Sequence, residues 1–367
     1  MKKKIISLLT ALVLVVLGVL FPELELFSEE ETPAETSAAT NAATKPAAPI
    51  SGNGMTIHFI DVGQADCALV ECDGQYMIID GGNVEDGQMV VSYLKQMGVE
   101  TLSSVVCSHA HEDHVGGLPA VLSVFKTESV YSPVDSYSTK VFRNFLAKTE
   151  DQGLSVTIPA PGDRFSLGSA TVTVLGPVQE YDDPNETSLI LKVSYGDSDF
   201  LFTGDMETGA ENDMMDHWGE DFDWNVEVLK VGHHGSETST GYRFLYYTDP
   251  TYGVISVGED NDYGHPHEAA MSKLRDAEVV MLRTDKLGHI IATTDGSEIS
   301  FTWENQNAQP EDVEPADGRH LFFGNKKSKT FHDADCKNLP KENNREDFAD
   351  YGAAIAAGYK PCGTCIN

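Results

Sequence analysis

One short stretch rich in metal ligands constrains this chain more than any other feature. Residues 108–117 read Ser-His-Ala-His-Glu-Asp-His-Val-Gly-Gly, directly after the apolar run Leu102–Cys107, which is typical of a buried strand. Neutral imidazole and carboxylate groups are the usual ligands of zinc, manganese and iron. A histidine-rich surface loop is the alternative, but so dense a ligand cluster after a strand favours a metal site. The spacing suits two adjacent cations, with His109 and His111 on one and Asp113 and His114 on the other.

The N-terminus has the pattern of an export signal. Lys2–Lys4 precede the uncharged, mostly apolar run Ile5–Phe21. Such a run enters a bilayer while the basic residues stay inside. Because no small-residue cleavage site follows it, residues 1–22 are predicted to be a membrane anchor in preference to a cleaved signal peptide. Residues 23–52, rich in Glu, Thr, Ala and Pro, cannot build a core and are predicted to be a disordered linker, so we expect an extracellular or cell-surface protein, membrane-anchored or secreted.

Negative charge is concentrated in the middle of the chain. The formal net charge is −33; residues 51–318 hold 13 Lys and Arg against 46 Asp and Glu, whereas residues 319–367 hold eight against six. A surface this acidic repels nucleic acid and anionic lipid unless a metal ion or a basic patch intervenes. Strong electrostatic attraction of DNA is therefore not expected from the middle of the chain.

Residues 53–306 are predicted to form the catalytic domain. The short β-prone runs Met55–Asp61, Cys67–Glu71 and Gln75–Asp80 are broken by Gly and Asp, which predicts a meandering sheet. Val115–Phe125, after the histidine cluster, is predicted to be a helix.

Polar side chains follow further predicted strands in this domain. Asp80 ends its strand as Asp113 follows another, so it is predicted to fix the metal-binding imidazoles by accepting their free N–H, the alternative being a turn residue before two glycines. Asp205 follows a second apolar run. His233 and His234, flanked by glycines, follow the predicted strand at residues 225–231; we assign His234 as a metal ligand and His233 as a substrate contact.

Three more motifs carry a specific resemblance to a known family. Segments 202–207, 229–236 and 256–267 read FTGDME, LKVGHHGS and SVGEDNDYGHPH. With the cluster at 109–114, they resemble the metallo-β-lactamase superfamily, and more narrowly the metallo-hydrolase domain at the C-terminus of ComEC competence channels and its free-standing relatives. The resemblance runs from Met55 to Phe301.

The resemblance implies an α/β fold, the αββα sandwich of the superfamily, and two divalent cations, Zn or Mn, in the active site. In the superfamily the residue at the place of Asp205 bridges both metals, so Asp205 and Asp113 are expected to act in catalysis. Ser236 and His265 are expected to contact a phosphate or donate a proton to the leaving oxygen, with a structural turn histidine as the alternative for His265. Asn185 stands where many members carry a histidine; it is predicted to lie beside the metals and to favour Mn²⁺ or Mg²⁺ over zinc.

The C-terminal segment is predicted to be a separate zinc module. Residues 307–318 are polar and predicted to be a linker, and residues 319–367 are too few to fold without a staple. The segment resembles the metal-binding module of the Ada DNA-repair protein, with a histidine where Ada has a cysteine. An oxidised pair of the last two cysteines, without metal, is the alternative in an oxidising compartment. The predicted ligands of one structural zinc are His332, Cys336, Cys362 and Cys365.

The sequence as a whole predicts an exported two-metal hydrolase, a phosphodiesterase or nuclease acting on DNA. The first alternative is a hydrolase of another small ester, lactone or β-lactam. The second is a surface protein that binds DNA without cutting it, although a pure binder needs no open two-metal site. No protein partner is indicated.

Overall fold

The structure is a computed structural model that describes residues 54–311, 321–334 and 336–366. The predicted anchor and disordered linker at residues 1–52 lie outside the described residues. Within the described ranges, no helix combines the length and the apolar character needed to cross a membrane.

The first sheet combines an antiparallel meander with parallel strands. The run from β1 to β3 is antiparallel, as the alternating short runs of the sequence predict, and β3 to β6 are parallel. Cys67, just before β2, and Cys72, at its end, lie in different hydrophobic clusters on opposite faces. In spatial order the strands are β15 (Ile299–Trp303), β14 (Ile290–Thr294), β1 (Met55–Phe59), β2 (Ala68–Cys72), β3 (Gln75–Ile79), β4 (Thr101–Val106), β5 (Lys126–Tyr131) and β6 (Val156–Thr157).

The second sheet repeats this arrangement. Its strands β7 to β10 are antiparallel, and β10 to β13 are parallel. The strand predicted at residues 225–231 is shorter, because the backbone N–H of Val226 donates to Thr248 outside the sheet. In spatial order the strands are β13 (Val280–Arg283), β12 (Tyr252–Ile255), β11 (Val228–Lys230), β10 (Ser198–Phe202), β9 (Ile190–Tyr195), β8 (Ala170–Gly176) and β7 (Arg164–Leu167).

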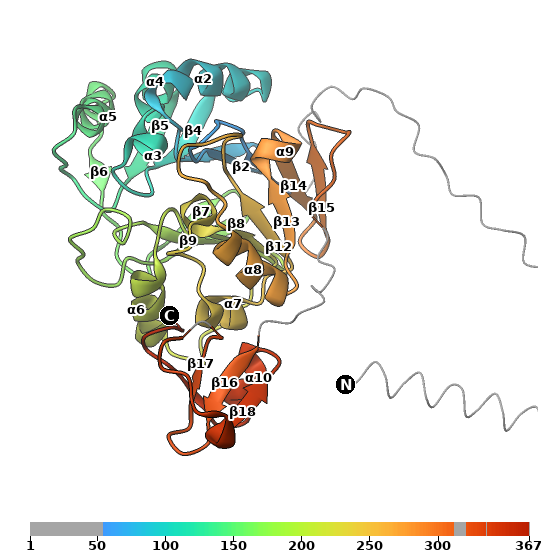
Figure 1. Ribbon diagram of the computed structural model, residues 1–367. Helices are drawn as coiled ribbons and strands as arrows, with labels where there is room; N and C mark the ends of the chain where they lie inside the picture. Colours follow the sequence, from blue (N-terminus) through green and yellow to red (C-terminus); the bar gives the residue numbers. More distant parts are fainter. Residues whose placement is uncertain (1–53, 312–320, 335, 367) are drawn as a thin grey trace, which may run out of the picture. The chain divides into compact units, whose positions relative to one another are not determined.

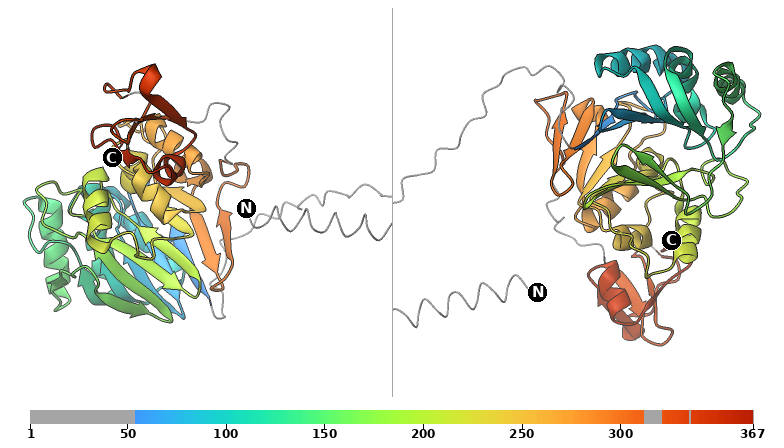
Figure 2. Two further views of the ribbon diagram at one scale, coloured as in Figure 1. Left: turned by 90° about the horizontal axis from the view of Figure 1, so that it is seen from below. Right: turned by 180° about the vertical axis from the view of Figure 1, so that it is seen from behind.

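The two sheets pack face to face between two layers of helices (Figures 1 and 2). One apolar cluster joins the inner faces of the sheets, and two more lie under the outer helices. The predicted αββα sandwich is confirmed. Helices α2 (Gly87–Gln96), α4 (Leu118–Val124) and α5 (Lys140–Asp151) cover the first sheet; α6 (Thr208–Trp218), α7 (Tyr242–Thr248) and α8 (Glu268–Asp276) cover the second; α9 (Thr284–Leu287) and the 3-10 turn η1 (Val84–Asp86) are short connections.

The helix predicted at Val115–Phe125 is broken in two. Helix α3 (Glu112–Val115) stops before Gly116 and Gly117, and α4 starts after them. A Cβ on Gly117 would lie 2.0 Å from the carbonyl oxygen of Gly81, so only glycine allows this approach. The break brings the turn after β3 against the turn after β4, and therefore brings Asp80 to the histidine cluster.

The C-terminal module has a small sheet of its own. Its strands, in the order β18 (Arg345–Phe348), β16 (Phe322–Asn325), β17 (Thr330–His332) and β19 (Lys360–Pro361), pack with α10 (Tyr351–Ala356) around Phe322, Phe331 and Tyr359; the 3-10 turn η3 spans Glu342–Asn344. Within the predicted linker, Glu311 pairs with Met281 of β13 through backbone hydrogen bonds.

Candidate metal centre

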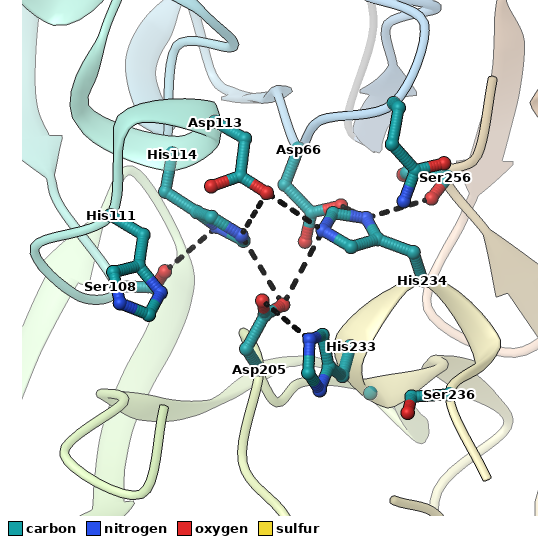
Figure 3. A network of polar contacts seen from close by, with 12 residues as sticks. Asp66, Ser108, His111, Asp113, His114, Asp205, His233, His234, Ser236 and Ser256 are labelled. Carbon is teal, nitrogen blue, oxygen red and sulfur yellow. Dashed lines mark hydrogen bonds and ion pairs between the residues drawn. The ribbon is translucent and has the colours of Figure 1, made fainter. Parts of the chain in front are cut away.

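The candidate ligands lie at the carboxyl ends of parallel strands from both sheets. Residues 108–114 follow β4, Asp205 follows β10, and the 3-10 turn η2 (Gly232–Gly235) follows β11. Ligand sites in open α/β sheets form at this edge, because consecutive loops converge there. Figure 3 shows His114, Asp113, Asp205 and His234 pointing toward one another from these loops.

Asp205 stands between two sets of imidazoles. Its Oδ1 lies 3.2 Å from Nε2 of His114 and 3.7 Å from Nε2 of His234. Its Oδ2 lies 3.8 Å from Nε2 of His109 and 3.6 Å from Nε2 of His233. Each oxygen of this 2% exposed carboxylate therefore faces its own pair of nitrogens, as a carboxylate shared by two cations would.

The set on the Oδ1 side has the composition of a metal site. One ligand atom from each of Asp113, His114, Asp205 and His234 lies within 4.8 Å of the others. Among the described residues, His114 Nε2 and Asp205 Oδ1 are buried without a hydrogen-bond partner, although they are neighbours. Buried polar atoms are almost always satisfied, so lone pairs that converge without hydrogen bonds fit a divalent cation.

The set on the Oδ2 side is looser. His109 Nε2 lies 3.1 Å from Nδ1 of His111, and both rings belong to the predicted first pair. His233, predicted only as a substrate contact, approaches the same Asp205 oxygen as His109. Asn185 is buried, and its Oδ1 has no hydrogen-bond partner within the described ranges; its place beside the metals stays a prediction. A second cation would find fewer anionic groups here than on the Oδ1 side.

Asp80 orients His114. Its Oδ2 lies 2.8 Å from Nδ1 of His114, and it accepts hydrogen bonds from the backbone N–H and the hydroxyl of Ser108 at 2.7 and 2.6 Å. A carboxylate on the far nitrogen fixes the tautomer and direction of a metal-binding imidazole. Asp80 also has a turn backbone, with φ 59° before two glycines, so the turn and the contact with His114 occur together.

A second buried carboxylate, which the sequence analysis missed, supports His234. Asp66, from the loop after β1, has Oδ1 3.3 Å from Nδ1 of His234, while that nitrogen also lies 3.0 Å from the carbonyl of Ser256. Lys230 pairs with Asp66 at 2.8 Å, and these side chains are 5% and 7% exposed. Lysine is almost never buried without a partner, so a lysine inside the apolar run of β11 was the available signal.

Burial and charge set the protonation of the site. Burial alone would lower the pKa of His234, but Asp205 and Asp66 raise it to about 10. Burial would likewise lower the pKa of His114, yet Asp205 and Asp80 raise it well above its usual range. Burial and the neighbouring His114 keep the pKa of His109 well below its usual range. A cation binding here must displace protons, so metal affinity rises with pH.

The histidine pair occupies a strained turn. His233 and His234 have φ of 49° and 53°, a left-handed conformation that costs a non-glycine residue about 1–2 kcal/mol. Gly235 follows at φ 81°, where a Cβ would lie 2.6 Å from Cβ of Pro266. The turn thus aims the two rings at different oxygens of Asp205 and packs against the loop that carries His265.

His265 is held as a neutral ring beside the site. Burial and the nearby His234 lower its pKa to about 4. The side-chain amide of Gln64 donates to Nδ1 of His265 (3.3 Å), and the Gln64 carbonyl accepts from the N–H of Gly258 (3.2 Å). Nε2 of His265 therefore carries the proton, which suits a hydrogen-bond donor to a phosphate better than a charged acid.

Ser236 does not join the ligand group. Its hydroxyl lies 2.9 Å from Oγ1 of Thr238, which in turn donates to Glu207 at 3.0 Å. The predicted phosphate contact of Ser236 thus stays a prediction.

The predicted zinc ligands of the C-terminal module converge. One ligand atom each from His332, Cys336, Cys362 and Cys365 lies within 4.8 Å of the others, and the cysteines are free thiols. The parallel pairing of β17 with β19 causes this, because the N–H of Cys362 donates to the carbonyl of Phe331, next to His332. Three sulfurs and one imidazole are a tetrahedral zinc set.

Family models match both the large domain and the C-terminal module. Residues 60–259 match the metallo-beta-lactamase superfamily, and residues 307–367 match the metal binding domain of Ada. The ComE operon protein 3 of Bacillus subtilis (strain 168) is 28% identical over 255 residues, which cover 64% of this chain and 32% of that protein. Competence protein ComA of Neisseria gonorrhoeae is 30% identical over 229 residues, covering 62% of this chain and 30% of that protein.

This chain thus spans about a third of the length of these curated relatives. Among solved structures, the metallo-beta-lactamase fold protein YhfI from Bacillus subtilis aligns with a TM-score of 0.42 and 13% identity, over 60% of this chain and 93% of that one.

Proposed function

The chain belongs to the metallo-beta-lactamase superfamily, and on that premise we propose that it is an exported phosphodiesterase that uses two divalent cations to hydrolyse DNA. The family match shows the metal-dependent hydrolase fold. The phosphodiester substrate, the choice of metal and the place of action are the proposed part.

The arrangement around Asp205 is the observation that carries the proposal. One buried carboxylate presents each of its oxygens to a separate pair of imidazoles, with Asp113 beside the first pair. When bound, two adjacent divalent cations supply Lewis-acid chemistry, neutralising the charge of a phosphodiester and activating water. A site for one structural cation would need no such sharing.

The protein's own groups have distinct parts in this scheme. His114 and His234 would hold one cation, with Asp80 fixing the far nitrogen of His114 and the Ser256 carbonyl, beside Asp66, fixing that of His234. His109 and His111 would hold the other, with Asn185 as the oxygen donor in place of a histidine. His265, a neutral donor, would hydrogen-bond a non-bridging oxygen of the phosphate. His233 lies within 3.3 Å of Glu207 through Nδ1 and would meet the substrate at the rim.

Similarity to a competence protein supports DNA as the substrate, and the charge of the chain limits how DNA is held. One relative is named as a competence protein, and the HHGS and YGHPH segments of residues 233–236 and 263–267 carry the resemblance to the competence-type metallo-hydrolase domain. The acidic middle block argues against broad electrostatic binding of DNA. We therefore propose that the cations engage a single phosphate, so that cleavage depends only weakly on salt.

The test compares substrates and metals on one protein preparation. Purified protein is assayed against DNA, a lactone, a β-lactam and a small phosphodiester, with Zn²⁺, Mn²⁺ or Mg²⁺ added in turn. Asp205→Ala should lower DNA hydrolysis on the order of a thousandfold, since it removes several kcal/mol of charge stabilisation in the transition state. Asp213→Asn on α6, outside the site, is the matched acidic control and should cut normally.

Bound metal is counted in parallel by mass spectrometry of the native protein. Asp205→Ala should lose metal while Asp213→Asn keeps it. If Asp205→Ala cuts DNA as fast as the parent with every metal, or if the lactone or β-lactam is hydrolysed faster than any phosphodiester, the proposed function is wrong.

A further inference from the structure

The loop between β12 and α8 presents a tyrosine ring to solvent beside the metal centre. Tyr263 is 69% exposed, more than any other large hydrophobic side chain among the described residues. A single exposed ring is ordinary on a protein surface, so exposure alone carries no conclusion. Two properties of the loop set this ring apart.

The first property is a stack that leads to the metal centre. The rings of Tyr263 and His265 are 5.7 Å apart at an interplanar angle of 22°. His265 is in turn 6.3 Å from His234 at 26°. The rings of His234, His265 and Tyr263 are therefore near-parallel neighbours in series. They connect a candidate metal ligand with an exposed tyrosine ring.

The second property is that hydrogen bonds fix the backbone of the loop that carries the ring. The side-chain amide of Asn261 donates to the carbonyls of Gly258 and His265, at 2.9 and 2.6 Å. Its oxygen accepts from the N–H groups of Tyr263 and His265, at 3.2 and 3.0 Å. The ring of His267 lies 3.1 Å from the carbonyl of Tyr263. A backbone fixed before the ligand arrives loses little conformational entropy on binding.

The charges of the loop indicate which part of a ligand can lie there. Glu259, Asp260 and Asp262 are exposed, and residues 256–267 contain no lysine or arginine. A phosphate would be repelled at this position. The uncharged face of a planar ring would not, because stacking needs no opposite charge.

Building on the phosphodiesterase function proposed above, we propose that Tyr263 is a stacking platform for an unpaired nucleobase next to the scissile phosphate. In a duplex the faces of each base are covered by its neighbours, whereas an unpaired base can place one face on an aromatic side chain. The substrate class is then single-stranded DNA, or a frayed end, in preference to intact duplex.

Binding to the full chain is measured by fluorescence anisotropy with a labelled oligothymidylate. Tyr263→Ala should weaken binding by about 5- to 150-fold, the range that base stacking on one aromatic side chain supports, while Tyr263→Phe keeps the ring and should bind within about twofold. Tyr246→Ala, at an exposed tyrosine on α7, is the matched control and should leave the affinity unchanged. A blunt duplex of equal length should bind more weakly than the single strand.

Abasic substitutions then locate the stacked base. Moved along the oligonucleotide, an abasic site should weaken binding to the wild type at one position and have no effect at that position in Tyr263→Ala. The platform is refuted if Tyr263→Ala binds like the wild type, if Tyr246→Ala loses as much, or if the duplex binds better than the single strand.

The proposed function is tested apart from the platform by hydrolysis of methyl p-nitrophenyl phosphate, which has no base. A stacking effect without hydrolysis of any phosphodiester would leave the platform supported and overturn the nuclease function.

Discussion

Replacing Lys230 by methionine tests whether the Asp66–Lys230 pair positions the metal ligand His234. Methionine fills similar space but removes the lysine cation, so the buried Asp66 carboxylate keeps only His234 as an ion-pair partner. Asp66 also lies within 4.8 Å of the ligand atoms of Asp80 and His114, so Lys230 offsets more than one buried negative charge. Breaking such a pair by removing one partner costs about 3–5 kcal/mol of unfolding free energy. The uncompensated charge of Asp66 is then removed by protonation of the carboxylate, or the loop that carries Asp66 shifts.

Both outcomes disturb His234, whose Nδ1 is 3.3 Å from Asp66. Losing a group that supports a metal-binding imidazole typically costs about 10–100-fold in metal affinity. We therefore expect Lys230→Met to unfold at lower urea and to bind its tighter cation about 10–100-fold more weakly, as measured by competition with a chromophoric chelator.

Lys192→Met is the matched control. Lys192 is also a mostly buried strand lysine, 2.8 Å from Asp199, and it donates to the carbonyls of Asp223 and Asn225, away from the metal centre. Its removal should destabilise the fold but leave metal affinity within about twofold. If both variants lose metal affinity equally, or if Lys230→Met keeps wild-type affinity, Asp66 and Lys230 contribute only to folding and do not position His234.

Three further predictions concern other parts of the chain. Asn185→His should raise zinc affinity relative to manganese, because an added imidazole favours the later metal; unchanged relative affinities would contradict the role of Asn185. His332→Ala should lower bound zinc by about one ion per chain while His332→Cys retains it, as counted by elemental analysis, and a wild-type module that holds no zinc would refute the site. Burial raises the pKa of Glu211 from 4.5 to about 7, so the folded protein holds a proton there that the unfolded chain has released. The unfolding free energy of the wild type relative to Glu211→Gln should then fall by about 3 kcal/mol as pH rises from about 4.5 to 7, and a flat difference in urea unfolding across that window would contradict this.

Local patterns were sufficient to predict most of the residues that the structure brings together at the candidate metal centre. The spacing of His109, His111, Asp113 and His114 lies within one loop, so their proximity follows from the covalent chain. Asp205 and the histidine pair were found because each follows an apolar run, and parallel strands bring their carboxyl ends to one edge. The zinc module was predicted in the same way, from four ligands and a Cys-x-x-Cys turn.

Contacts between distant segments were outside the reach of these patterns. Lys230 and Asp66 meet across the interface of the two sheets, at 2.8 Å, and nothing near either residue in sequence indicates the other. The assignment of His234 as ligand and His233 as substrate contact had no geometric support in the sequence, because adjacent residues in a turn can point either way. Their left-handed backbone, supported by Gly235 against Pro266, decides that His234 joins Asp113 and His114 while His233 faces the other oxygen of Asp205.

The sequence by itself therefore determined which chemical groups this protein has and the strands that carry them. Tertiary structure alone decided which oxygen of Asp205 each imidazole faces, which buried charges hold those imidazoles, and that helix α3 ends where Gly117 meets Gly81. The physical reason is range: hydrophobic periodicity and ligand spacing act between near neighbours in the chain, whereas burial of a charge is tolerated only where packing of remote segments supplies its partner.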